Sequence, residues 1–367
     1  MVFIAIGFFS FFAATTLAID VGLFMTARSQ AQNAADAGAL AGAVAFAYNS
    51  FDDRSSGGPV VQSAINTATA NKVIGEPVSV EPGDVTFPIG SNGTFNRIKV
   101  TVYRTALRQN PIPTLIGPVF GIDEFDVVAS ATAEAAPATG VKCVKPFIIP
   151  DRWQERQDAV WSENSTFDRY NNKGVVIANP DVYVMPGQTG YKGYTDRDKG
   201  DYLQLRAANS NKIAPTMYYS WKMPGEIGGN FYEDNISGCN PTVISPGVIA
   251  TQEPGAMAGP TLDGIKALME KDPTARWDSG TKTVVSPFGS SSPRLFPIPL
   301  YNPDTYQNGM QTGRNATLNV VNFLAFFLES YDNSGIYGRV AGLTGVIDPN
   351  APALPQDSLI KAIRLVQ

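Results

Sequence analysis

The sequence predicts an α+β protein with a long apolar N-terminal helix, a small α/β module and a larger β-rich domain. Three observations support this fold class. No charged residue occurs from Met1 to Ile19. Residues 59–134 mix helical and alternating apolar patterns, and strand and turn signals dominate from Val141 onward. We expect three domains with these limits: 1–48, 49–137 and 138–367.

The first predicted element is a helix that begins in an uncharged segment and continues to Tyr48. At about 1.5 Å per residue, residues 1–19 extend over roughly 28 Å, close to the hydrocarbon thickness of a bilayer. Bulky phenylalanines lie on every side of this segment, which argues against an amphipathic surface helix. Two alternatives remain: the helix spans a membrane, or it is buried inside a bundle of helices.

Small residues recur every four positions in the second half of this helix. Ala34, Gly38 and Gly42 lie on one line, where helix backbones can approach closely. We therefore predict that these three residues pack against copies of the same helix or against partner subunits.

Two runs in this helix resemble a known family. AIDVGLF (residues 18–24) and QAQNAADAGALAGA (residues 30–43) are similar to the N-terminal region of TadG-like proteins of tight-adherence (Flp) pilus systems. The resemblance implies a bacterial cell-envelope protein, anchored in the inner membrane or assembled in an extracellular filament, with its remainder outside the cytoplasm. It also implies that other pilus subunits, copies of the chain and the membrane are partners. It transfers no catalytic residue.

The chain departs from that family at its start. Family members usually carry charges before the apolar run, whereas this sequence begins MVFI. We therefore expect that processing removed the true N-terminus or that further residues precede Met1. Type IV pilins also have a glutamate near the mature N-terminus, where Ala5 and its neighbours are apolar.

The small module is predicted to be pilin-like. A helical pattern covers residues 60–73, an extended segment covers 78–87, and apolar residues alternate over 95–105. A turn at residues 90–94 joins the last two segments as a hairpin. A short helix at 114–120 and a strand at 125–134, whose small side chains suit packing on the long helix, complete the module.

The β-rich domain has one convincing helical pattern, at residues 261–271. Thr261 is expected to cap it, and Asp272-Pro273 ends it. The apolar run 320–328 is too short to cross a bilayer as a helix, so it predicts a buried central strand paired with 338–347.

Cys143 and Cys239 are the two cysteines of the chain. In an exported protein this even count favours a disulfide, and closing so long a loop contributes on the order of 4 kcal/mol. The alternative is a pair of buried free thiols.

Composition excludes several functions. The net charge is −5 without a basic cluster, which disfavours nucleic-acid binding. The chain has no histidine, so histidine-based catalytic triads and histidine-ligated zinc are excluded. Only paired acids, for example Asp151 with Glu155 and Asp158, remain for hydrolysis, and most acids simply face solvent. We therefore predict that the protein is not an enzyme.

A candidate calcium site lies at Asp196, Asp198 and Asp201, around Gly200. Ala207 occupies the position where an EF-hand has glutamate, so a plain charged turn is the alternative. No other cofactor is expected.

Two further patterns have simple interpretations. Four Asn-x-Ser/Thr sites, at Asn92, Asn164, Asn235 and Asn315, indicate surface loops. Aromatic residues gather in the large domain, where they form either a sugar-binding strip or, as is more usual, part of a core; they are Trp153, Trp161, Tyr218, Tyr219 and Trp221.

The sequence thus favours a structural, pilin-related component of a Tad/Flp-type pilus. Its helix either anchors the protein for pilus assembly or polymerises into a surface filament. The remaining hypothesis is an anchored protein that binds or cleaves carbohydrates, with surface glycans as partners.

Overall fold

The protein is described here from a computed structural model, which covers residues 2–49, 53–90, 96–158, 161–208, 212–253, 257–311, 317–348 and 350–366. Several side chains between residues 2 and 17, and that of Gln311, are outside this description. The described residues include five α-helices and a larger β-rich part, which confirms the α+β class.

The chain divides into two compact units. The first comprises Met1–Phe46, Phe51–Ala135 and Ile363–Gln367, and the second comprises Ala47–Ser50 and Ala136–Ala362. The predicted limits of three domains stay a prediction.

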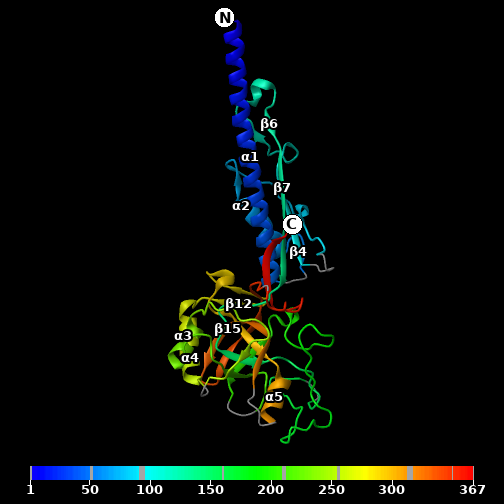
Figure 1. Ribbon diagram of the computed structural model, residues 1–367, viewed down its shortest axis with the longest axis vertical. Helices are drawn as coiled ribbons and strands as arrows, with labels where there is room; N and C mark the ends of the chain where they lie inside the picture. The colour runs from blue at the N-terminus through cyan, green and yellow to red at the C-terminus, as the bar shows by residue number, and fades with distance from the viewer. Residues whose placement is uncertain are drawn as a thin grey trace. The chain divides into compact units, whose positions relative to one another are not determined.

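The first unit is organised around helix α1 (Val2–Tyr48), drawn in blue in Figure 1. The alanine-rich second half of α1 packs on α2 (Pro59–Ala70), where Val60, Val61, Ala64 and Ala68 are buried. Pro59 begins α2 because its missing N–H lies in the first turn, where no intrahelical acceptor exists. The helix predicted at 60–73 is confirmed by α2.

A sheet in the order β18-β7-β4-β3 completes this core. Its strands are β3 (Val85–Thr86), β4 (Arg97–Arg104), β7 (Val127–Pro137) and the end of β18 (Ile360–Val366). β7 runs beside α1, as Figure 1 shows, and Gln32 of α1 donates to Ser130 O at 3.2 Å. Ile98, Val100 and Val102 of β4 are fully buried, so the predicted alternation is confirmed. The predicted β3–β4 hairpin is confirmed by the pair Val85↔Val100, while residues 91–95 of its connection lie outside the described residues.

Short elements connect these strands. β1 (Lys72–Val73) pairs with β2 (Glu76–Pro77), and β5 (Ile112–Pro113) pairs with β6 (Glu124–Phe125). Three 3-10 turns lie among them: Pro82–Asp84, Ala106–Arg108 and Gly117–Phe120. The last of these is a 3-10 helix of four residues inside the short helix predicted at 114–120.

The second unit contains a sheet that closes on itself. The order is β15-β14-β8-β10-β9-β16, and β16 pairs back onto β15, while the short β11 (Ile249–Ala250) pairs with β15. The bounds of the ring strands are as follows: β8 Phe147–Pro150, β9 Tyr202–Ala207, β10 Met217–Ser220, β14 Leu295–Tyr301, β15 Leu318–Asp332 and β16 Gly335–Ala341. Short pieces accompany them: η4 Asp196–Asp198, β12 Arg276–Asp278, β13 Thr283–Val285, η5 Gly289–Ser291 and β17 Leu343–Thr344.

Strand β15 confirms the predicted central strand. Every residue from Val320 to Leu328 is buried, and β15 pairs antiparallel with β16, for example at Ala325↔Ala341. Of the aromatic residues singled out from the sequence, Trp153, Tyr218 and Trp221 are buried in the same core.

Three α-helices belong to the second unit: α3 (Gly229–Ser237), α4 (Ala258–Lys271) and α5 (Pro303–Gln311). Only α4 was predicted. Thr261 does not cap it; the N-cap is Met257, and the Thr261 hydroxyl, buried inside the helix, donates to Met257 O at 2.7 Å. Asn235 is buried in α3 rather than on a surface loop, whereas Asn164 is exposed. Asn92 and Asn315 lie outside the described residues.

Candidate assembly interface

The described side chains in the first half of α1 are mainly apolar and exposed. Phe3, Phe8 and Phe11 are 90%, 70% and 73% exposed, and Ile4 and Met25 are also largely exposed. The second half differs, since Ala27, Ala31 and most small residues that follow are buried in the first unit. Because covering one phenylalanine contributes roughly 1.5–3 kcal/mol, the exposed segment is a strong candidate for contact with an apolar partner.

The small-residue line of α1 lies inside the unit. A Cβ added to Gly38 would lie 2.9 Å from Ala68 Cβ and 3.0 Å from Ala64 O, both on α2. One added to Gly42 would collide with the Ile98 side chain of β4. Ala34, on the same line, is fully buried. The close packing that these residues permit is thus formed within the chain, and their contact with other subunits stays a prediction.

A hairpin beside α1 extends the apolar surface. The carboxylate of Asp20 accepts hydrogen bonds from Leu115 N at 2.9 Å and Ile116 N at 3.3 Å, and Phe24 contacts Phe125 edge-on. Four apolar side chains of this hairpin are half exposed or more: Leu115, Val119, Phe120 and Ile122. These four residues were not predicted as an exposed surface. The high density of apolar residues between Pro113 and Asp123 is the sequence pattern that could have indicated it.

The comparison with known families agrees with this division of α1. Residues 1–45 match the family described as "Putative Flp pilus-assembly TadE/G-like". The chain carries a TadE/G-like segment. The match covers α1 from its first residue to Ala45. No curated protein and no solved structure matches the chain.

The TadE/G-like match supports involvement in Flp pilus assembly and is consistent with a location in the cell envelope or outside the cell. The matched family is a pilus-assembly family and not an enzyme family. Among the described residues, no helix has the length and hydropathy of a membrane span, so the predicted span is not confirmed.

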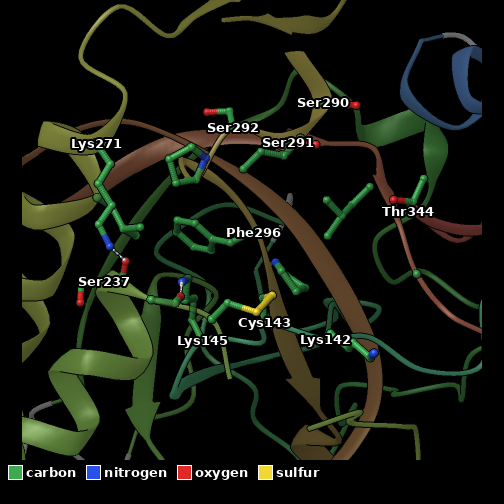
Figure 2. A pocket seen from close by; sticks show the side chains of 18 of the residues that line it. Lys142, Cys143, Lys145, Ser237, Lys271, Ser290, Ser291, Ser292, Phe296 and Thr344 are labelled. Carbon is green, nitrogen blue, oxygen red and sulfur yellow. Dashed lines mark hydrogen bonds between the residues drawn. A yellow bond between two sulfur atoms is a disulfide. The ribbon is translucent and has the colours of Figure 1, made fainter. Parts of the chain in front are cut away.

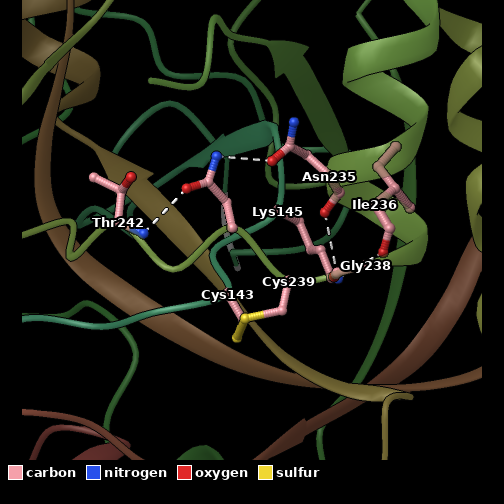
Figure 3. The surroundings of a disulfide bond; sticks show 8 residues. Cys143, Lys145, Asn235, Ile236, Gly238, Cys239 and Thr242 are labelled. Atoms are coloured by element: carbon pink, nitrogen blue, oxygen red, sulfur yellow. Dashed lines mark hydrogen bonds between the residues drawn. A yellow bond between two sulfur atoms is a disulfide. The ribbon is translucent and has the colours of Figure 1, made fainter. Parts of the chain in front are cut away.

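The disulfide predicted outside the TadE/G-like segment is confirmed. Cys143 and Cys239 are bonded, with Cα atoms 4.3 Å apart and a sequence separation of 96. Figure 3 shows the bond beside the end of α3, and Cys143 N donates to Asn240 O at 3.0 Å. The Lys145 ammonium, two residues further along, donates to Ile236 O at 2.6 Å and Gly238 O at 2.8 Å. A covalent bond and a buried cation therefore hold the end of this helix.

The candidate calcium ligands contact cations of the protein. Asp196 lies 3.3 Å from Lys199 Nζ and 3.1 Å from Lys361 Nζ. Asp198 and Asp201 both form ion pairs with Arg152, at 2.5 and 3.1 Å. In the part of the chain that the structure describes, no group of three acidic or cysteine side chains is arranged to hold a metal ion. The calcium site stays a prediction, and these ion pairs favour the charged-turn alternative.

Asp151 and Glu155, two of the carboxylates considered for hydrolysis, have different surroundings. Asp151 is fully buried and accepts from the hydroxyls of Tyr183 and Tyr191 at 3.0 and 2.8 Å. Burial raises its pKa to about 6, against the opposing effect of these hydrogen bonds. Glu155 instead accepts from the backbone N–H groups of its own turn, including those of Gln157 and Asp158. The carboxylates of Asp151 and Glu155 therefore both form hydrogen bonds with other groups of the protein.

Proposed function

We propose that this protein is a structural component of a Tad/Flp-type pilus, which buries the exposed half of α1 against other subunits or in the membrane. The observation that carries the proposal is that the TadE/G-like match includes a helix segment in which Phe3 and Phe11 are 90% and 73% exposed. A monomer that kept this surface in water would aggregate, so an apolar partner is required.

The two forms of this proposal, an anchored assembly component and a polymerising subunit, use the same helix surface. The pilin relationship of the small module rests on its helix and sheet, in which β7 packs along α1. The carbohydrate hypothesis loses its aromatic strip, because Trp153, Tyr218 and Trp221 are buried. We therefore do not favour it as the main function.

Charges placed on the exposed half of α1 test the proposal. The double variant Phe3→Glu/Phe11→Glu should abolish recovery of the protein with sheared pili and envelope membranes, because burying unpaired carboxylates costs several kcal/mol. Leu107→Glu is the matched control: Leu107 is 91% exposed in the same unit but lies in the turn Ala106–Arg108.

Electron microscopy and fractionation of cells give the result. Both variants should keep the disulfide and the circular dichroism of the parent protein, while only the double variant is lost from pili and membranes. Normal pili and normal fractionation of the double variant would refute the role of α1.

A further inference from the structure

A pocket of about 490 Å³ lies in the second unit, next to the disulfide. Its walls are formed by residues 142–145, by the ends of α3 and α4, and by segments 290–297 and 343–346. This volume falls in the range of pockets that hold small organic molecules. Figure 2 shows Ser290, Ser291 and Ser292 together along one wall and Lys145 beside Cys143.

The charge of the lining is one-sided. Lys142, Lys145 and Lys271 line the pocket, and none of the described lining residues is Asp or Glu. Asp272 directly follows Lys271 in the sequence. Its carboxylate is buried and accepts hydrogen bonds from the hydroxyls of Ser286 and Ser292. The remaining polar groups of the lining are mainly hydroxyls, from Tyr48, Thr344 and the serines.

Part of this positive charge has a structural role. Lys145 donates to the carbonyls of Ile236 and Gly238, and Lys271 donates to Ser237 O, so both cations bind the end of α3. A helix C-terminus carries only about half a negative charge, which is less than the charge of the Lys271 ammonium alone. The structural role therefore leaves excess positive charge at the pocket, and Lys142 adds to it.

We propose that this pocket binds a small anion of sugar size that carries a carboxylate or a phosphate group. The anion would accept hydrogen bonds from Lys271 and Lys142, while the hydroxyls contact its polar remainder. The disulfide fixes the wall that contains Lys145, because Cys143 and Cys239 both line the pocket. This inference is independent of the proposed role of α1.

The electrostatics of Lys145 support an anionic ligand and set its pH dependence. Burial, and secondarily the charge of Lys271, lower the pKa of Lys145 to about 7. A bound anion stabilises the protonated ammonium and raises this pKa, so binding takes up a proton. Affinity should therefore rise as the pH falls through about 7 and level off about one unit lower, where the amine of the free protein is already mostly protonated.

Matched sugars test the proposal. The full chain, kept soluble in detergent, is titrated by calorimetry with glucuronic acid, glucose 6-phosphate and glucose. We expect the charged sugars to bind about tenfold more tightly than glucose, which corresponds to one charge-assisted hydrogen bond. Binding of only one charged sugar identifies the preferred anionic group, whereas equal binding of all three, or no saturable binding of any, overturns the proposal.

Lysine variants assign the binding to this pocket. Lys271→Ala and Lys142→Ala should each weaken binding of the charged sugars about tenfold, by loss of one such hydrogen bond. Lys266→Ala is the control, since Lys266 is exposed on α4 and outside the lining. Unchanged affinity in both lining variants, or an affinity that rises with pH, contradicts the proposed site.

Discussion

At the scale of single residues, the carboxyl of Asp151 is a buried titratable group inside the second unit. Besides Tyr183 and Tyr191, its surroundings include Arg152 N, which donates to Oδ1 at 2.9 Å. Asn322 donates to the Tyr191 hydroxyl at 2.9 Å and so extends the network to strand β15. Every partner donates to the carboxylate, yet desolvation is the larger effect and raises the pKa to about 6.

This pKa makes stability depend on pH in a defined direction. The folded protein holds the Asp151 proton more firmly than the unfolded chain, whose pKa is near 3.8. Protonated Asp151 therefore contributes its full share to the unfolding free energy below about pH 4. This share, about 3 kcal/mol, is lost as the pH rises through about 6. Asp151→Asn should flatten the fall in unfolding free energy across this window, as measured by urea denaturation at several pH values.

Asp181 titrates in the same window, because burial raises its pKa to about 6 as well. A residual slope should therefore remain in Asp151→Asn. Asp263→Asn, at an exposed position of α4, serves as the control and should follow the parent protein. Identical slopes for the parent and Asp151→Asn would show that the Asp151 carboxyl does not control this part of the pH profile.

At the scale of elements, the contact of α1 with α2 depends on glycines whose surroundings differ. A Cβ at Gly38 meets the Ala64 carbonyl and the Ala68 Cβ, which cannot move independently of the backbone. A Cβ at Gly42 meets the end of the Ile98 side chain, which can rotate away. Gly22 has no atom within 4 Å of an added Cβ. We expect Gly38→Ala to lower the unfolding free energy by about 1–3 kcal/mol, and more than Gly42→Ala does.

Thermal unfolding of three single variants checks this order. Gly22→Ala is the control and should be neutral or slightly stabilising, since alanine has the higher helix propensity. If Gly38→Ala is as stable as the parent, the helices are not packed as closely as the structure indicates.

The elements also show where sequence patterns were sufficient. β15 was predictable because nine consecutive positions are apolar except for Asn322, a pattern typical of a strand buried on both faces. α3 (GNFYEDNIS) has no comparable pattern, and its end is held by Lys145 and the disulfide, which come from a distant segment. The same limit applies to the lysine pocket, whose walls come together only in the fold. The apolar first half of α1 was predictable from the sequence, because this prediction depends on local composition alone.

At the scale of the whole molecule, apolar surface is distributed unevenly along the chain. From Ala27 onward, α1 contributes fully buried residues to the core of the first unit, whereas the side chains described before Ile19 are exposed. The described side chains before Ile19 are not part of the core of the first unit. In the proposed function, these side chains contact an apolar partner.

Deletion of residues 2–19 should separate folding from association. We expect the shortened chain to unfold cooperatively, with an unfolding free energy within about 0.5 kcal/mol of the parent, as for changes at exposed sites. It should associate less than the parent without detergent in sedimentation, because Phe3, Phe8 and Phe11 are gone while the exposed hairpin at residues 115–122 remains. Deletion of residues 2–34 is the control and should destroy the cooperative unfolding of the first unit, since it also removes Ala27, Ala31 and Ala34 from the core. If the shorter deletion already unfolds this unit, residues 2–19 belong to its fold. The division of α1 into a packing half and an assembly half is then wrong.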